Sequence, residues 1–115
     1  MQLASNGILA SEKVIAENPK LVSAFVGAFL KGLKYTIDHP DDAYALSATY
    51  IPNFANLDKT VQKEILTTSI EMWKADRLGY SDPQAWKNMN DVLVKMQLIP
   101  KSVDLNKAFT NQFVP

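Results

Sequence analysis

The residues of this 115-residue chain that could do chemistry are few, and the clearest group surrounds one histidine. His39 is the single imidazole; Asp38 precedes it, Pro40 follows it, and Asp41 and Asp42 come next. An imidazole beside carboxylates could act as a general base or hold a metal ion weakly. The same residues also suit a polar helix terminator next to the acidic first turn of another helix. We favour this structural interpretation, because a lone histidine in a turn without a converging partner makes a poor active site.

Other signatures of catalysis or metal binding are absent from the sequence. The chain has no cysteine, which excludes disulfides, thiolate zinc sites and thiol catalysis. It contains no glycine-rich phosphate loop, zinc-protease helix motif or serine-hydrolase elbow. The aspartates around His39 lack the spacing and the closing glutamate of a calcium loop. We therefore predict no catalytic residue, no metal ligand, no cofactor and no enzymatic activity.

Two tryptophans are the side chains best suited to stack on a planar ligand. Trp73 and Trp86 both fall on apolar faces of expected helices. Aromatic residues at helical spacing usually belong to a hydrophobic core, and we interpret both tryptophans in that way. The four tyrosines stay open to either interpretation, since each hydroxyl needs water or a partner.

The elements that must position these residues are mostly helices. Asn18 and Pro19 start a helix that should end near Asp38, and its apolar residues recur at three- and four-residue spacing in a stripe wide enough for two neighbours. Gly27 and Gly32 lie inside it, where each costs about 1 kcal/mol relative to alanine, and we expect close approach of another backbone there.

Further start signals mark the other helices. We expect a single turn over residues 11–16 capped by Ser11, a short helix from Pro40, and a helix from Asp58 to about Asp76 with Gly79 as its stop. Val61, Ile65, Leu66, Ser69, Met72 and Trp73 should form the apolar face of that helix. Another begins at residues 81–83, and a last short one follows residues 102–104. Before the turn at residues 11–16, residues 6–10 could form one short strand that follows a turn. The predicted fold is a mainly α single domain, residues 1–115, of four to five helices with at most one short N-terminal strand.

The charge balance excludes one class of partner. Twelve basic residues match twelve acidic ones, and residues 1–57 carry −1 while residues 58–115 carry +1. Nucleic-acid binding relies on a basic surface for phosphate contacts, so we predict no nucleic-acid partner. The first residues show neither a basic leader region nor a long apolar one, which is typical of a cytoplasmic chain or of a piece whose leader lies elsewhere.

A set of short motifs, in a particular order, covers nearly the whole chain. They comprise residues 6–13, Asn18-Pro19-Lys20-Leu21-Val22, Phe25, Ala28, Lys31-Gly32, Tyr35, His39-Pro40-Asp41-Asp42-Ala43, Trp73, Gly79, Trp86, Leu98-Ile99-Pro100, Val103-Asp104 and residues 109–113. This order resembles the C-terminal portion of ABC-transporter substrate-binding proteins of the thiamine-pyrimidine, taurine and alkanesulfonate type. Members of that family are roughly three times longer than this chain.

The resemblance implies a small-molecule ligand, an ABC permease as partner and no catalysis, although one branch of the superfamily makes a thiamine pyrimidine. Ligands of such two-lobed proteins sit beside the crossing between the lobes, which Ser5, Asn6 and Gly7 resemble. We take these three as the ligand-binding candidates, with a plain turn as the alternative. The compartment would be periplasmic for a piece of a secreted protein and cytoplasmic if Met1 is the true start.

The resemblance also predicts self-association. In the family fold these helices pack on a sheet built largely from residues that this sequence does not include, so faces containing Phe25, Phe29 and Leu33 should be uncovered. Soluble monomers rarely leave large apolar patches open, and we expect a homo-oligomer. The alternative function is a free-standing helical module for protein interaction or oligomerisation, with no small-molecule ligand.

Overall fold

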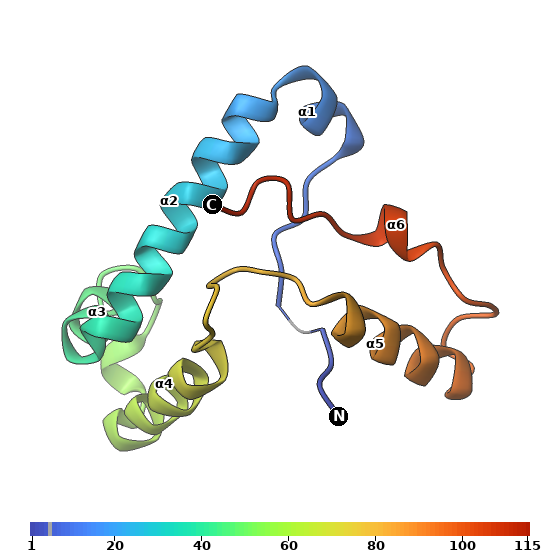
Figure 1. Ribbon diagram of the computed structural model, residues 1–115. Coiled ribbons are helices and arrows are strands. Elements are labelled where there is room, and N and C mark those ends of the chain that lie inside the picture. Colours follow the sequence, from blue (N-terminus) through green and yellow to red (C-terminus); the bar gives the residue numbers. More distant parts are fainter. Residues whose placement is uncertain (5) are drawn as a thin grey trace. The chain divides into compact units, whose positions relative to one another are not determined.

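The computed structural model describes residues 1–4 and 6–115 and divides the chain into two compact units. The first unit comprises Met1–Gly27 and Gly79–Pro115, and the second comprises Ala28–Leu78. The described residues form six α-helices and one 3₁₀ turn (Figure 1). In chain order they are α1 (Glu12–Glu17), α2 (Pro19–Asp38), α3 (Pro40–Ser47), η1 (Phe54–Asn56), α4 (Lys59–Trp73), α5 (Pro83–Lys95) and α6 (Leu105–Ala108). The mainly α prediction is confirmed, and the count of helices is six rather than four or five.

Short polar side chains start four of these helices. Ser11, Asp58, Asp82 and Asp104 each accept a hydrogen bond from a backbone N–H in the first turn of α1, α4, α5 and α6. Such caps satisfy donors that have no partner inside the helix, and each contributes about 1 kcal/mol. Proline begins α2, α3 and α5, where its missing N–H costs nothing. Local chemistry therefore explains where the helices begin.

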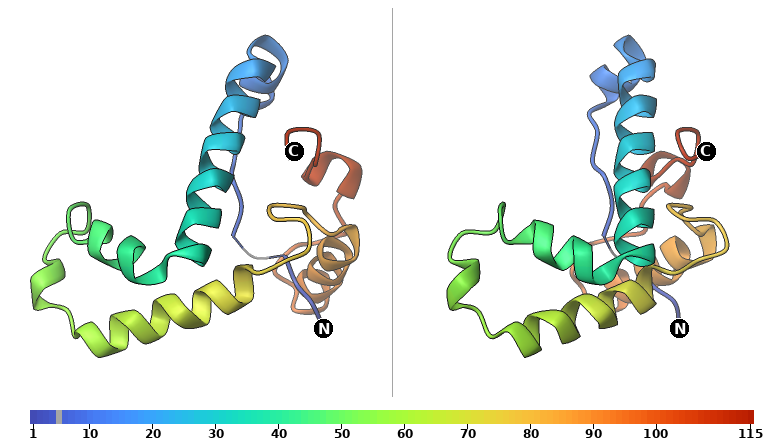
Figure 2. Two further views of the ribbon diagram at one scale, coloured as in Figure 1. Left: turned by 60° about the vertical axis from the view of Figure 1, so that its left-hand side comes forward. Right: turned by 90° about the vertical axis from the view of Figure 1, so that its left-hand side faces the viewer.

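In the second unit, the chain turns at His39 and α3 then lies beside α4 (Figure 2). The rings of Tyr44 in α3 and Phe54 in η1 pack with their centroids 5.0 Å apart. Ile70 of α4 is the buried apolar side chain of this unit, with 5% of its surface exposed.

In the first unit, α5 packs against α6. Trp86 of α5 stacks on Phe109, with ring centroids 5.1 Å apart and planes only 7° from parallel. Val26 and Ala85 are the buried apolar residues of the first unit. Trp86 is half-buried, and so is Trp73 in α4 of the second unit, as expected for aromatic residues that face a core.

The described residues bury few apolar side chains for a chain of this length. The chain exposes 9085 Å², whereas a folded monomer of 12.8 kDa exposes about 6300 Å². Even two separate units of these sizes would together expose only about 7600 Å² by the same scaling. Among the exposed residues, Phe25 and Phe29 keep 57% and 50% of their surface open, as predicted. Leu33, by contrast, is half-buried.

Four other expectations are corrected. Residues 6–10 form no strand, since no described segment pairs with them. The helix that begins after Asp58 ends at Trp73 instead of about Asp76, because Lys74 adopts an extended backbone, so Gly79 is not its stop. Val61, Ile65 and Met72 are exposed, whereas the other members of the predicted face, Leu66, Ser69 and Trp73, are half-buried. Gly27 and Gly32 meet no neighbouring backbone, since nothing lies within 4 Å of the position of an added Cβ at either glycine.

None of the helices in the described part of the chain combines the length and the apolar character that a membrane span requires.

The single-domain prediction for residues 1–115 stays a prediction.

Candidate functional site

The corner between α2 and α3 contains the only histidine. The backbone N–H of His39 donates to the carbonyl of Tyr35 at 2.8 Å, and its carbonyl accepts from the N–H of Ala43 at 3.0 Å. The imidazole lies against the Tyr35 ring, with centroids 4.7 Å apart. The Tyr35 hydroxyl donates to the Asp42 carboxylate, and this hydrogen bond raises the pKa of Tyr35 above its ordinary value of 10.0. These contacts support the interpretation of His39 as a structural corner residue.

A second polar contact links α3 to α4. The Lys63 Nζ donates to the Asp41 carboxylate at 2.7 Å and lies 5.5 Å from the centre of the Tyr44 ring. The hydrogen bond to Lys63 lowers the pKa of Asp41 below 3.8, and the same bond raises the pKa of Lys63 above 10.5. Asp41 and Lys63 are 22 positions apart in the sequence, so their hydrogen bond forms only when α3 and α4 are packed together.

This contact makes a testable pH prediction. Replacing Lys63 by methionine should return the pKa of Asp41 to about 3.8, because the donor that stabilises its charged form is removed. In the native protein the Asp41 contribution is complete above that ordinary value and is lost as the pH falls through the lowered pKa. The Lys63 contribution is complete below 10.5 and is lost as the pH rises through the raised pKa.

The measurement is a carbon-detected NMR titration of the Asp41 carboxyl. Lys59→Met, which removes a neighbouring exposed lysine of α4, is the matched control and should leave the Asp41 midpoint unchanged. A native Asp41 that already titrates at its ordinary value would show that the pair does not form in solution.

The three aspartates around His39 do not converge on one point. Asp38 binds Lys34 at 2.8 Å, Asp41 binds Lys63, and Asp42 accepts from Tyr35. The residues that the structure describes contain no group of three histidine or carboxylate side chains that could hold a metal ion. Asp41 and Asp42 instead occupy the first turn of α3, as predicted for helix-end charge.

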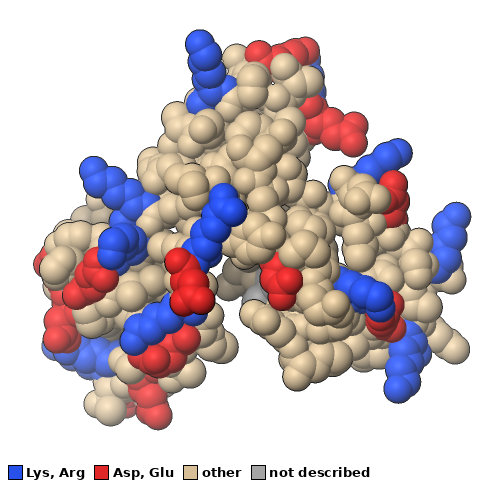
Figure 3. Space-filling model, in the orientation of Figure 1, with Lys and Arg blue, Asp and Glu red and all other residues tan. Residues whose placement is uncertain are grey.

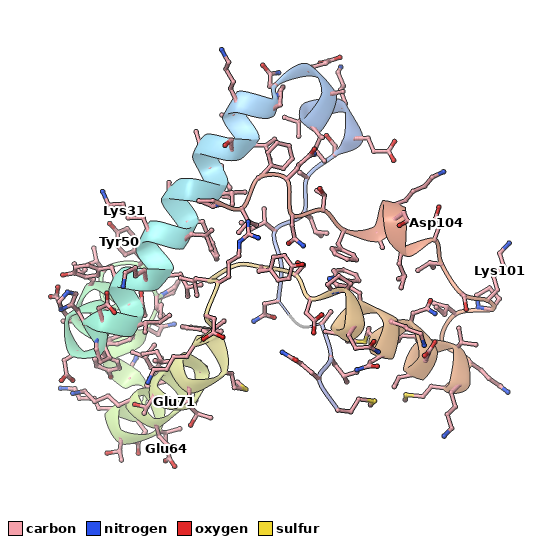
Figure 4. The ribbon with its side chains drawn as sticks, viewed as in Figure 1. Lys31, Tyr50, Glu64, Glu71, Lys101 and Asp104 are labelled. Atoms are coloured by element: carbon pink, nitrogen blue, oxygen red, sulfur yellow. The ribbon has the colours of Figure 1, made fainter. Side chains whose placement is uncertain are left out.

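Surface hollows of the second unit are shallow and open. One of about 490 Å³ on α2 is lined by Ala28, Lys31, Gly32, Lys34, Tyr35 and Asp38. Lys31 extends from α2 toward open space (Figure 4). Charged side chains of both signs are intermixed on the face drawn in Figure 3, in keeping with lysine–carboxylate pairs such as Lys74–Glu71 and Lys87–Asp91. A wide, shallow hollow of this kind does not by itself enclose a ligand.

The predicted ligand-binding residues lie in the N-terminal segment. Ser5 is outside the described residues, and Asn6 and Gly7 are exposed in a stretch without regular secondary structure. The space around Gly7 is open, with nothing within 4 Å of an added Cβ. The segment is therefore accessible, and its role as a ligand contact stays a prediction.

Two asparagines of the first unit were not anticipated. Asn90 in α5 is buried, and its Oδ1 accepts the backbone N–H of Val103 at 3.0 Å. Asn111 bonds Ser81 twice, accepting its N–H at 2.8 Å and donating to its carbonyl at 2.9 Å. The burial of Asn90 could have been predicted from the sequence, because Asn90 continues the helical spacing of the apolar residues Trp86, Met89 and Leu93.

Comparison with known proteins finds sequence similarity over part of the chain and to part of one curated relative. Residues 1–43, which contain both the Asn6-Gly7 segment and the His39 corner, match the profile of the family described as NMT1/THI5 like. The chain is related to the NMT1/THI5-like proteins. It is 41% identical to the riboflavin-binding protein RibY of Chloroflexus aurantiacus, an alignment that covers 98% of this chain and 34% of RibY. The resemblance identified from the sequence is thereby confirmed.

Two less similar proteins carry an enzyme name. The 4-amino-5-hydroxymethyl-2-methylpyrimidine phosphate synthases of Candida albicans and Legionella pneumophila are 25% and 22% identical. The alignments cover 92% and 90% of this chain but only 29% and 31% of those proteins. The chain thus spans about a third of the length of the curated relatives that it matches. No solved structure matches it significantly.

Proposed function

We propose that this chain is the C-terminal part of a solute-binding protein that binds a riboflavin-like small molecule reversibly and without catalysis. The observation that carries the proposal is the 41% identity to a riboflavin-binding protein across 98% of the chain. The relatives named as synthases are considerably less similar, at 25% and 22% identity. The structural contacts of His39 also favour binding over catalysis, since its backbone and ring serve the α2–α3 corner.

The proposal extends to partners and location. A solute-binding protein of this type delivers its ligand to an ABC permease from the periplasmic side of the membrane. Asn6 and Gly7 are the proposed ligand contacts of the described residues, because they are exposed and lie within the family match. Ser5 belongs to the same proposal.

Riboflavin is the probe that tests this function. We expect riboflavin to raise the melting temperature of the chain, because a ligand that binds only the native state stabilises it by about 2.7 kcal/mol at a hundredfold excess over Kd. In a heteronuclear NMR titration, the backbone amide signals of Asn6 and Gly7 should shift as riboflavin is added. These shifts should saturate at the same riboflavin concentration as the rise in melting temperature. 4-Amino-5-hydroxymethyl-2-methylpyrimidine is the comparison ligand and should have the weaker effect.

Variants separate a specific site from general adsorption. Asn6→Ala should weaken riboflavin binding, whereas Asn106→Ala, which changes an exposed asparagine of α6, should not. Absence of any thermal or NMR response to riboflavin would contradict the proposal for this chain.

The second candidate is a helical oligomerisation module, and the exposed apolar side chains favour it. Phe25 and Phe29 on α2 and Val61 and Ile65 on α4 are all exposed. Such faces in a soluble protein commonly mark interaction surfaces. A concentration-independent mass above that of the monomer in light scattering, combined with no response to riboflavin, would favour this module over the solute-binding part. We propose self-association in either case.

A further inference from the structure

The Asn6-Gly7 dipeptide combines a reactive sequence with an open backbone. The chain contains eight asparagines, and Asn6 is the one followed by glycine. We propose that Asn6 is a site of spontaneous covalent modification, at which the side-chain amide is lost and aspartate and isoaspartate are formed. The inference does not depend on the proposed ligand.

The reaction needs only the chain and water. The backbone nitrogen of Gly7, after losing its proton to a base in solution, attacks the Cγ carbon of the Asn6 amide. The new N–C bond closes a five-membered succinimide, the Cγ–NH₂ bond breaks, and the leaving nitrogen takes the proton back from the base and departs as ammonia. Water then adds to either carbonyl of the ring, and opening of the ring leaves aspartate or isoaspartate. No oxidant, reductant or enzyme takes part.

The structure leaves this attack unhindered. Both residues are exposed and lie outside any helix, so the backbone can rotate to bring the Gly7 nitrogen to Cγ. Gly7 has no Cβ, and nothing lies within 4 Å of where one would be. Glycine is also the residue with the widest backbone freedom, which the strained succinimide geometry requires.

None of the seven other asparagines precedes a glycine, and several are held or flanked in ways that oppose the reaction. Asn18 precedes Pro19, whose nitrogen carries no proton to lose. Asn90 is buried in α5 with its oxygen bonded to Val103, and Asn111 is bonded to Ser81. Asn106 is exposed, like Asn6, but precedes a lysine. It therefore serves as a control for the effect of the following residue.

The modification changes the charge of the whole chain. The unmodified protein has a formal net charge of zero, and each conversion of Asn6 adds one negative charge. Isoaspartate in addition inserts a methylene into the main chain at this position. Modified and unmodified chains should therefore separate by isoelectric focusing, with the modified form on the acidic side.

The test is incubation of the full chain at physiological temperature and mildly alkaline pH, followed by tryptic peptide mapping. The peptide of residues 1–13 contains Asn6 as its single asparagine. We expect this peptide to gain about one dalton and to split into two chromatographic products, with faster conversion at higher pH. The peptide of residues 102–107, which contains Asn106, should change far more slowly.

Gly7→Ala is the matched control variant. The open space around Gly7 and the absence of a positive φ there allow alanine without disturbing the fold, while the added Cβ hinders the attack. We expect loss of the isoaspartate product in this variant. Persistence of the intact Asn6 amide in the native chain, or equal conversion in Gly7→Ala, would overturn the inference.

Discussion

Replacing Ile70 by alanine is expected to lower the free energy of unfolding of the second unit by about 2–5 kcal/mol, the range found for large-to-small substitutions in protein cores. Ile70 lies in α4 with only 5% of its surface exposed, and it is the buried large apolar residue of the described part of this unit. A small domain has about 5–15 kcal/mol of stability in total, so this loss is a large fraction of it. Urea denaturation followed by circular dichroism measures the change.

Ile65→Ala is the matched control, because it makes the same substitution in the same helix at a position that is 54% exposed. It should change the free energy of unfolding by no more than about 0.5 kcal/mol. An equal loss of stability in both variants would show that the two faces of α4 are equally covered in solution. If Ile65→Ala also lowers the mass in light scattering, that face of α4 is the site of self-association.

The beginnings of the helices could be predicted from the sequence because the signals are local. Ser11, Asp58, Asp82 and Asp104 cap a backbone N–H within three residues, so each carries its own partner with it. The prolines that begin α2, α3 and α5 act through their own ring geometry. The acidic first turn of α3 is recognisable in the same way.

The burial of apolar residues could not be predicted in the same way, because periodicity shows that a face is apolar but not what covers it. Ile65 was predicted to lie on the apolar face of α4 and Ile70 was not, yet Ile65 is exposed and Ile70 is buried. The wide apolar stripe of α2 indicated two neighbours, whereas the family resemblance predicted that Phe25 and Phe29 are uncovered, and they are exposed.

In the candidate site too, features that depend on sequence order were predictable, and contacts between separate elements were not. The order of motifs along the chain indicated the resemblance, and residues 1–43, which include Asn18 and His39, match the profile described as NMT1/THI5 like. The pairing of Asp41 with Lys63 was not predictable, because it depends on how α3 packs against α4. The ligand is inferred from RibY, and the local contacts of Asn6 and Gly7 do not identify it.

Replacing Asn90 by alanine should be the most destabilising polar substitution in the first unit. Asn90 is 7% exposed, and its Oδ1 accepts the N–H of Val103 at 3.0 Å, which ties the segment before α6 to α5. Alanine would leave that N–H without its partner, and an unsatisfied donor of this kind costs about 1–3 kcal/mol. Denaturation measures the loss, and hydrogen exchange at the Val103 amide should accelerate in parallel.

Asn88→Ala tests whether this effect belongs to the buried bond or to asparagine in α5 in general. The Asn88 Nδ2 donates to the carbonyl of Gln2 at 2.9 Å in an exposed contact, where water can replace the lost partner. Its removal should therefore cost no more than about 0.5 kcal/mol and leave exchange at Val103 unchanged. Equal losses from the two variants, or a protected Val103 amide in Asn90→Ala, would contradict the assignment of Asn90 as the buried link between α5 and the segment that leads to α6.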